Sequence, residues 1–313
     1  MAGFLVIGEA LVDLLSEAGS WRFEAAPGGS PLNVAVGLAA AGHRVRLACE
    51  LGDDLFGELI RGHLDRYGVD PADLLTTDAP TNLAFARLDA AGVASYDFRL
   101  GWRWGGRPDL TGVRCLHIGS LGAVLAPGDA AVRRVVADAH RRGVPVSYDP
   151  NVRPALIGDG ARPAIEALVA AADLVKLSAD DLAWLRPGEP IAEVAAGWLR
   201  RGRPRLVVVT RGAAGAVGFT RTGRYECPAP PVEVVDTVGA GDAFTAGLLS
   251  SLDRAGGLAP VLAEPDPAAI EAAIQEAVAV AAATCRHRGA APPAPEVVDR
   301  LRAAISGRFE LFE

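Results

Sequence analysis

Lysine and cysteine are scarce in this sequence. Lys176 is the only lysine, which excludes any mechanism that needs two. The four cysteines, Cys49, Cys115, Cys227 and Cys285, lie far apart and form no CxxC pair, so they predict neither a zinc site nor a disulfide framework. We expect them to be reduced, mostly buried thiols.

The sequence also lacks an excess of positive charge and any long hydrophobic run. Its net charge is −7, its pI is near 5.4 and its arginines are scattered, which argues against nucleic acid or an anionic membrane as a partner. No apolar run is long enough to cross a bilayer. The N-terminal segment carries Glu9 and Asp13 and no basic region, unlike a signal peptide. We therefore expect a cytoplasmic protein that binds neither nucleic acid nor membrane.

Apolar residues are plentiful, 50% of 313, which is enough for a large buried sheet in one domain spanning residues 1–313. From Cys115 onward, short apolar runs alternate with helical patterns. This alternation predicts an α/β fold with a doubly wound, mainly parallel sheet flanked by helices, in which ligands bind at the carboxyl ends of the strands. The runs are CLHIGSL, VPVSYDPN, DLVKLS and LVVVTRG.

The first expected strand, Phe4–Ile7, delivers two acidic residues to that edge of the sheet. Glu9 and Asp13 follow it closely. Asp13 is therefore a candidate for holding substrate hydroxyl groups. A solvated loop or a capping carboxylate is the alternative, and position alone does not decide between them.

A glycine-rich segment leads into the next expected helix. Gly28 and Gly29 let a ligand approach the backbone closely. Ser30, followed by proline, is a good N-cap, so we expect a helix from Ser30 to near Gly42. Asn33 lies in its first turn with hydrogen-bonding groups to spare. Gly28, Gly29 and Asn33 therefore look like a platform for a polar ligand.

A hairpin interrupts the parallel pattern. Asn82–Leu88 and Val93–Arg99 are alternating runs joined by a turn signature, and with a short strand at Trp21–Glu24 they predict a small separate sheet. We expect this sheet to form a lid of about residues 16–26 and 82–104. Its aromatic face could stack on a sugar, pack on a second subunit to make a homodimer, or form the core of the lid. The side chains of that face are Tyr96, Phe98, Arg99, Trp102 and Trp104.

The stretch Asp236–Gly247, DTVGAGDAFTAG, is a loop that runs into a helix. Gly239, Ala240 and Gly241 precede Asp242 there. The first amides of a helix have no intrahelical partner and the dipole is positive at that end, so this entry can bind a phosphate. The carboxylate beside it is a candidate general base. Alternatively, the glycines only shape a turn and Asp242 complements the helix dipole.

Two of these segments together resemble the signatures of the ribokinase-like (PfkB) carbohydrate kinase family. One is Gly28–Ala35, with Gly42 and Gly52 at the family's spacing, and the other is Asp236–Asp242. They occur in the family's order, and the hairpin and a C-terminal Gly289 followed by prolines also agree, so the resemblance covers essentially the whole chain. It implies the ribokinase-like fold and an ATP-dependent sugar kinase.

On the acceptor side, the resemblance implies that Asp242 accepts the proton of a hydroxymethyl group. The amides from Gly239 to Asp242, those of Ala240 and Gly241 included, would bind the transferring phosphate. For Arg153, pairing with a carboxylate is the alternative role, since arginine often serves buried ion pairs. The residues expected to bind the sugar are Asp13, Gly28, Gly29, Asn33, Phe98, Arg99, Asn151 and Arg153.

On the nucleotide side, the implied cofactors are ATP and Mg²⁺, the latter held largely through waters. Where the family often has Asn-x-x-Glu, this chain has Ser178 and Asp181. Asp181 is thus a water-mediated Mg²⁺ candidate, and a helix N-terminal acid is its alternative role. A monovalent cation, K⁺, is common in the family, with Asp236 and the Val238 carbonyl as its expected ligands. The residues expected on the nucleotide side are Lys176, Thr210, Gly212, Gly215, Ala282 and Gly289.

The acceptor sugar is less defined. The start GEALVDLL, the pair Gly119-Ser120 and the DPNVR of Asp149–Arg153 look most like fructokinases, with 2-keto-3-deoxygluconate kinases second. We expect phosphorylation of fructose to fructose 6-phosphate. The alternatives are 2-keto-3-deoxygluconate, or another sugar or a nucleoside. A catalytically silent protein that senses a sugar or a nucleotide is the alternative of a different class.

Overall fold

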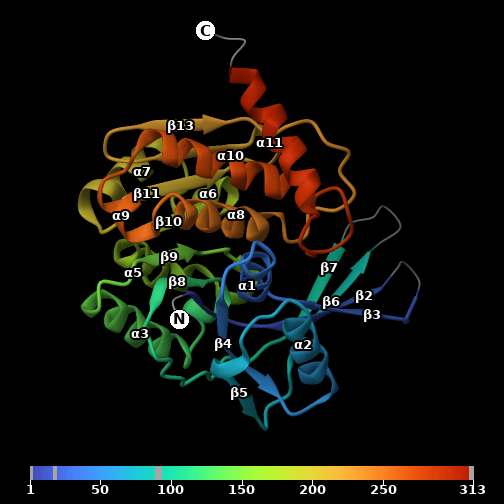
Figure 1. Cartoon of the computed structure of the whole chain (residues 1–313). Coiled ribbons are helices and arrows are strands. Elements are labelled where there is room, and N and C mark those ends of the chain that lie inside the picture. The colour runs from blue at the N-terminus through green and yellow to red at the C-terminus, as the bar shows by residue number, and fades with distance from the viewer. Residues whose placement is uncertain (1–2, 17–19, 89–93, 310–313) are drawn as a thin grey trace.

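The computed structural model of the protein describes residues 3–16, 20–88 and 94–309, and its elements are labelled in Figure 1. Within these residues the larger sheet has nine strands in the order β13-β12-β11-β10-β9-β8-β1-β4-β5, and the smaller has four in the order β3-β2-β6-β7. The strands are β1 (Gly3–Ile7), β2 (Leu11–Ser16), β3 (Glu24–Gly28), β4 (Val45–Gly52), β5 (Leu74–Thr77), β6 (Asn82–Leu88), β7 (Ala94–Arg99), β8 (Val113–Gly119), β9 (Val146–Asp149), β10 (Leu174–Ser178), β11 (Leu206–Thr210), β12 (Ala216–Phe219) and β13 (Arg224–Cys227).

The larger sheet is parallel from β11 to β5, and β12 and β13 extend it with antiparallel strands at one edge. Strand β1 lies between β4 and β8, and its residues Phe4 to Ile7 are at most 1% exposed. Strands this apolar need helices on both faces. The predicted fold class is confirmed, whereas the two antiparallel strands were not predicted.

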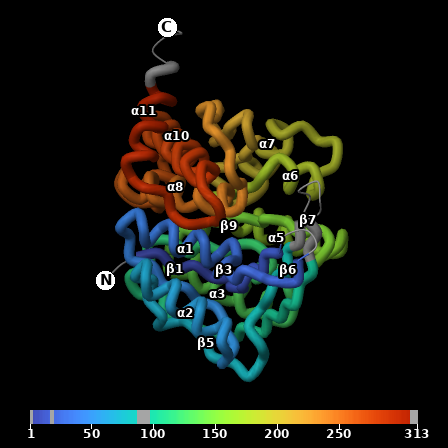
Figure 2. The backbone as a smooth tube through the Cα atoms, turned by 90° about the vertical axis from the view of Figure 1, so that its right-hand side faces the viewer, coloured from blue at the N-terminus to red at the C-terminus, as the bar shows by residue number. Residues whose placement is uncertain are grey.

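Helices cover both faces of the larger sheet (Figure 1, Figure 2). The chain crosses from β1 to β4 through α1, and in the opposite direction from β8 to β11 through α3, α5 and α7. Right-handed crossovers in opposite directions place α1 on one face and the other three helices on the other face. Helix α8 packs between α1 and α10. The helices are α1 (Ser30–Ala40), α2 (Leu55–Arg66), α3 (Asp129–Arg141), α4 (Pro154–Ile157), α5 (Arg162–Ala171), α6 (Ala179–Leu185), α7 (Ile191–Arg201), α8 (Ala240–Arg254), α9 (Leu258–Ala263), α10 (Pro267–Thr284) and α11 (Pro295–Phe309).

Among the helices that the structure describes, none is both long and apolar enough to cross a bilayer.

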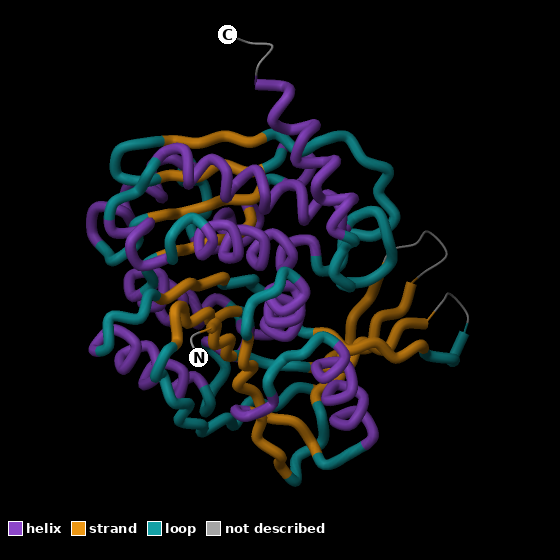
Figure 3. The backbone as a smooth tube through the Cα atoms, viewed as in Figure 1, coloured by secondary structure: helices purple, strands orange, loops and turns teal. Residues whose placement is uncertain are grey.

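The smaller sheet projects to one side of the larger one (Figure 3). Strand β2 pairs antiparallel with β3 and parallel with β6, and β6 pairs antiparallel with β7, which confirms the expected hairpin. The hairpin's turn, residues 89–93, lies outside the described residues. The sheet therefore has one strand more than the sequence predicts, namely β2.

Strand β2 lies where the sequence predicts no strand, directly after β1. Val12 and Leu14 are buried there, while Asp13 is half-buried and Leu15 is exposed. This alternation is that of a strand with one buried face. Asp13 therefore lies on a strand of the smaller sheet. The partner strand expected at Trp21–Glu24 is found later, as β3.

The aromatic face expected on the lid is only partly there. Trp102 and Trp104 are 2% and 1% exposed and stack on each other at 6.0 Å, within the core. The prediction that they lie on the lid face is therefore wrong. Burial of two large aromatic side chains stabilises the core more than exposure on a lid would, and this outweighs their nearness in sequence to β7. The side chain of Tyr96 lies outside the described residues.

Small residues let α1 and α8 pack closely. A Cβ added to Gly37 of α1 would stand 2.8 Å from the Cβ of Ala246 on α8. At the far end of the same helix pair, His43 contacts Ser250 Oγ at 2.8 Å and Asp253 at 3.3 Å. The contact therefore holds from one end of α8 to the other.

We expect Gly37→Ala to lower the free energy of unfolding by about 1–3 kcal/mol, because overpacking forces the two helices apart. Gly62→Ala is the matched control, since Gly62 lies on α2 with no atom within 4 Å of the added Cβ. There alanine should be neutral or stabilising by up to about 1 kcal/mol. Urea denaturation measures both, and equal changes in the two variants would contradict the tight contact.

Candidate active site

The first turns of α1 and α8 meet at one carboxylate. Asp242, in the first turn of α8, is only 8% exposed. Its Oδ1 accepts a hydrogen bond from Ser30 Oγ at 2.6 Å, and its Oδ2 accepts one from Asn33 Nδ2 at 2.8 Å. Both donors stand in the first turn of α1. They fix the orientation of the Asp242 side chain.

The role expected for Ser30 as an N-cap is wrong. The N-cap of α1 is Gly29, whose φ of 105° suits only glycine, and Ser30 is the first helical residue. Helix α1 has no side-chain capping bond, and the Ser30 hydroxyl donates instead to Asp242. Asn33 lies in the first turn as predicted, but its amide nitrogen is also bound to Asp242.

The start of α8 has the form of an anion site. Gly239 is left-handed at φ 76°, and a Cβ there would stand 2.3 Å from Ala290 Cβ. The amides of Ala240 and Ala243 are bound to Thr237 and Gly239. Among the described residues, the structure shows no acceptor for the amides of Gly241 and Asp242. Two amides at a helix N-terminus, one of them on an exposed glycine, suit a phosphate group.

The surroundings of Asp242 favour a proton acceptor. Burial raises the pKa of its carboxyl above the ordinary value, and the hydrogen bonds from Ser30 and Asn33 and the charge of Lys176 act in the opposite direction. A carboxylate whose pKa is raised takes a proton more readily than an exposed one.

Asp13 faces the same place from β2. The pKa of its carboxyl is raised to about 6, mainly by burial; the charge of Arg153 opposes this rise and the charge of Asp242 adds to it, so Asp13 interacts with both. A Cβ on Gly28 would stand 2.1 Å from Asp13 Oδ2, so Gly28 makes room for this carboxylate. On Gly29, a Cβ would stand 2.8 Å from the Glu9 carbonyl oxygen. The structure therefore brings Asp13, Gly28, Gly29 and Asn33 together around Asp242.

Phe98 and Arg99 lie on opposite faces of the smaller sheet. Phe98 stands on β7 opposite Ala84, which is itself opposite Asp13, so Phe98 shares the face of the sheet that carries Asp13. The neighbouring Arg99 points to the other face. Its side chain is 65% exposed and forms an ion pair with Asp97 at 2.6 Å. The structure therefore keeps Arg99 away from the site.

The loop after β9 carries Asn151 and Arg153. Asn151 has a positive φ of 39°, and its Oδ1 accepts a hydrogen bond from Arg153 Nη1 at 2.7 Å. No carboxylate among the described residues lies within ion-pair distance of Arg153, so the alternative of a structural ion pair is not observed. Its exposed guanidinium, whose charge reaches Asp13, is available to an acceptor.

Both carboxylate oxygens of Asp181 accept hydrogen bonds from the protein. Its Oδ2 accepts from the amide and hydroxyl of Ser178 in a capping box at the start of α6, and its Oδ1 accepts from the amide of Val152 at 2.8 Å. It is thus a helix N-terminal acid that also holds the loop before Arg153. Its contact with Mg²⁺ through water stays a prediction. Within the described residues, no three His, Cys, Asp or Glu side chains are grouped to hold a metal ion by themselves.

The loops expected at the nucleotide lie near the ends of β11, α8 and α10. Asp236 joins two of them, since its Oδ1 accepts from Val238 N at 3.0 Å and its Oδ2 from Gly289 N at 2.9 Å. Thr210 ends β11 beside Ser178 of β10, and Ala282 is buried in α10. Both Gly212 and Gly215 have a positive φ in the turn after β11.

Lys176 differs from the other residues expected on the nucleotide side. It is 4% exposed, and its Nζ donates to Asp149 Oδ2 at 2.8 Å. It lies behind the start of α8, where a Cβ on Gly241 would stand 3.1 Å from Nζ. The structure therefore places this lysine beneath the anion site and does not expose it on a nucleotide-facing loop.

Sequence reasoning missed three residues of the site. Ser30 had a signal, since residues three apart in a helix share a face and Asn33 was already selected. No sequence signal marked Asp149 and Thr245 as neighbours of Lys176, because Asp149 comes from a neighbouring strand and Thr245 from α8.

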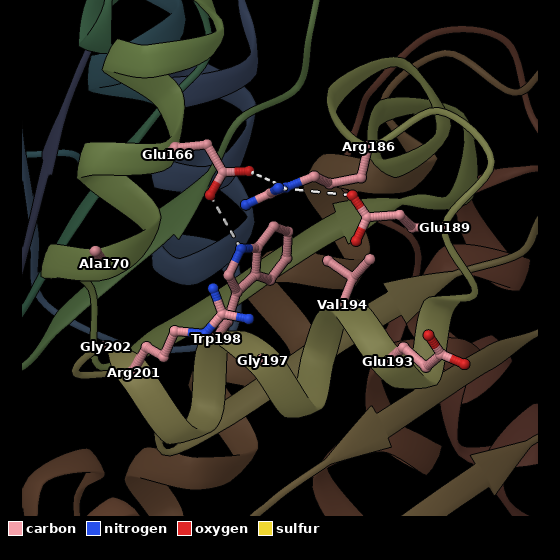
Figure 4. A pocket seen from close by; sticks show the side chains of 10 residues that line it. All are labelled: Glu166, Ala170, Arg186, Glu189, Glu193, Val194, Gly197, Trp198, Arg201 and Gly202. Atoms are coloured by element: carbon pink, nitrogen blue, oxygen red, sulfur yellow. Dashed lines mark hydrogen bonds and ion pairs between the residues drawn. The ribbon is translucent and has the colours of Figure 1, made fainter.

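A separate pocket of about 180 Å³ lies between α5, α7 and the turn that follows α6 (Figure 4). Glu166 accepts there from Arg186 Nε at 2.6 Å and from Trp198 Nε1 at 3.1 Å, so its carboxylate is already bound. None of the residues that line this pocket belongs to the site around Asp242.

The protein belongs to the pfkB family of carbohydrate kinases, whose family model matches residues 1–297. Among its relatives is a fructokinase of Klebsiella pneumoniae, 35% identical over 274 residues that cover 82% of this chain and 89% of that one. The structure of Xylella fastidiosa fructokinase with bound ATP has a TM-score of 0.87 at 30% identity, covering 97% of this chain and 98% of that one. Fructokinase from Vibrio cholerae O395, with fructose, ADP and calcium ion bound, has a TM-score of 0.82 at 27% identity, covering 96% and 99%.

The titration of Asp13 makes a pH dependence testable. An ionised Asp13 accepts stronger hydrogen bonds from sugar hydroxyls than a protonated one, so kcat/KM for the sugar should fall as the pH drops through about 6. Asp13→Asn should lower kcat/KM by about 10-fold or more at neutral pH. It should also reduce the slope of the acid limb of the pH profile by one, because one titrating carboxyl group is removed. Steady-state kinetics between pH 5 and pH 8 measure this. An unchanged acid limb in Asp13→Asn would remove Asp13 from this role.

Proposed function

We propose that this protein is an ATP-dependent sugar kinase that transfers the γ-phosphoryl group to the hydroxymethyl group of fructose, giving fructose 6-phosphate. The observation that carries the proposal is the placement of Asp242. It is a buried carboxylate oriented by Ser30 and Asn33, directly beside helix amides that suit a phosphate. The fructokinase relatives support fructose as the acceptor. We also propose a cytoplasmic location, which is consistent with a sugar kinase that uses ATP.

In the proposed mechanism the chain positions the acceptor and holds the charges. The Asp13 carboxylate accepts hydrogen bonds from sugar hydroxyls, and Phe98 packs on the same side. Asp242 accepts the proton of the attacking hydroxymethyl group, while the amides of Gly241 and Asp242 donate to the phosphoryl oxygens where negative charge develops. When bound, ATP with Mg²⁺ supplies the phosphoryl group and neutralises part of its charge.

We assign the remaining contacts to loops that the chain already holds in place. The turn after β11 and the end of α10 would border the nucleotide, through Thr210, Gly212, Gly215, Ala282 and Gly289. Asp181 would meet Mg²⁺ through water, using a lone pair left beside its bonds to Ser178 and Val152. Asp236 and the Val238 carbonyl would hold K⁺. Asp236 already bridges the two loops there, so a cation would reinforce an existing link.

A second acceptor is 2-keto-3-deoxygluconate. The observation in its favour is the exposed guanidinium of Arg153, which has no carboxylate partner among the described residues and suits the carboxylate of an acid sugar. Comparison of kcat/KM for fructose, ribose, 2-keto-3-deoxygluconate and nucleosides with Mg-ATP decides, since specificity is a difference in transition-state binding. We expect fructose to be highest. Sugar binding without phosphorylation of any of them would indicate a sensor and contradict the kinase.

Asp242→Asn should lower kcat by about 10²–10⁴-fold, because the base is lost, and leave KM for the sugar within a few-fold. A coupled assay of ADP release with fructose and Mg-ATP measures it. Asp65→Asn, an exposed acid on α2, is the control and should keep wild-type turnover. Wild-type turnover in Asp242→Asn would refute the assignment of the base.

We also propose a homodimer formed through the smaller sheet. Trp102 is buried and takes no part, but Leu15, Trp21 and Phe23 at that sheet are 42%, 83% and 39% exposed. Light scattering at micromolar protein should give twice the chain mass, and the double variant Trp21→Glu/Phe23→Glu should shift it toward the monomer. A monomeric wild-type protein would contradict the proposal.

A further inference from the structure

The only lysine of the chain forms a buried ion pair behind the active site. Lys176 Nζ lies 2.8 Å from Asp149 Oδ2, and the two side chains are 5% and 1% exposed. They come from the adjacent strands β10 and β9. A charge pair this deep is costly to desolvate and needs close geometry and further hydrogen bonds to be tolerated.

The additional hydrogen bond ties the pair to α8. Thr245 Oγ1 donates to Asp149 Oδ2 at 3.2 Å and also lies 3.1 Å from the carbonyl oxygen of Gly241. Lys176 Nζ approaches Gly241 so closely that a Cβ there would stand 3.1 Å from it. The ion pair is thus packed beneath the helix turn that contains Asp242 and the anion site.

We propose that Lys176 is a positioning residue: a fixed positive charge, balanced by Asp149, that lies behind Asp242 and the phosphate-binding amides and does not touch the nucleotide. The proposal rests on the proposed function of Asp242 as the base. It replaces the expectation that Lys176 borders the nucleotide, because the buried Nζ is already bound to Asp149.

The groups that face Asp242 come from several elements. Ser30 and Asn33 of α1 donate to it, Asp13 of β2 interacts with it by charge, and Lys176 and Asp149 act on it with opposite signs. Burial alone lowers the pKa of Lys176, but the ion pair with Asp149 raises it above its ordinary value, so the lysine stays charged. Lys176 lowers the pKa of Asp242, whereas Asp149 raises it.

These signs give a pattern that loss of packing would not reproduce. Without the Lys176 charge, Asp242 and Asp149 are two buried carboxylates with no cation between them, so Asp242 holds its proton to higher pH. Without the Asp149 charge, Asp242 and Asp181 still favour the charged form of Lys176. Lys176 then acts on Asp242 with no opposing charge from Asp149, and Asp242 loses its proton at lower pH. Removal of both charges should nearly cancel.

The test compares Lys176→Gln, Asp149→Asn and the double variant. The acid limb of kcat, measured with Mg-ATP and the best acceptor, should move up by about one pH unit in Lys176→Gln, down in Asp149→Asn, and return close to wild type in the double variant. KM for ATP should stay within about three-fold. Thr245→Val removes a hydrogen bond but no charge, so its acid limb should stay in place.

A rise in KM for ATP with an unmoved acid limb in Lys176→Gln would make the lysine a nucleotide ligand and overturn the proposal. So would equal shifts in the single and double variants. Gln is chosen because it keeps a donor for Asp149 and so favours folding, which thermal unfolding checks. If Lys176→Gln still fails to fold, the neutral double variant supplies the comparison with Asp149→Asn, and the absence of opposed shifts there overturns the proposal as well.

A measurement without substrate separates this proposal from the proposed function. In protein labelled with carbon-13 aspartate, the carboxyl signal of Asp242, assigned by its loss in Asp242→Asn, reports its protonation directly. Its titration midpoint should move in the same directions in the three variants. If the midpoint moves but no sugar is phosphorylated, the electrostatic role of Lys176 stands and the proposed kinase function is contradicted. If the enzyme is active but the midpoint does not move, the kinase function stands and the role of Lys176 is contradicted.

Discussion

The site depends on the contact between the first turns of α1 and α8. Ser30 and Asn33 reach Asp242 across separations of 212 and 209 residues. They can do so because the two helices pack closely, with Gly37 against Ala246. Core packing and the orientation of the Asp242 carboxylate are therefore linked in this protein. A change in helix spacing also moves the carboxylate, even when it occurs far from the phosphate-binding amides.

Each of the two carboxylates proposed to face the acceptor interacts with a different cation. Burial raises the pKa of both Asp13 and Asp242, and the opposing positive charge is Arg153 for the first and Lys176 for the second. The two cations differ in kind. Arg153 is exposed on a loop and available to an acceptor, whereas Lys176 is enclosed with Asp149 and can act only through its charge.

The two sheets carry different parts of the proposed site. Asp242 and the anion site belong to a helix anchored on the larger sheet, while Asp13 and Phe98 belong to the smaller one. The parts are joined where β3 runs directly into α1, at Gly28 and Gly29. Both glycines are required there, since a Cβ would collide with the Asp13 carboxylate or with the backbone of Glu9. The strand that makes room for the Asp13 carboxylate therefore continues into the helix that orients the base.

The sequence alone determined the α/β class, the hairpin and the start of α8, because periodicity, turn chemistry and a glycine-rich helix entry are local features. It did not reveal β2, whose buried alternation is only a few residues long, nor the burial of Trp102 and Trp104, which depends on where the chain returns after β7. The ion pair of Lys176 with Asp149 could not be predicted from the sequence either, since it depends on the register of adjacent strands under α8. The sequence itself identifies the residues next to Asp242 along the chain. The tertiary structure decides which charges surround Asp242, because charges act through space and not along the sequence.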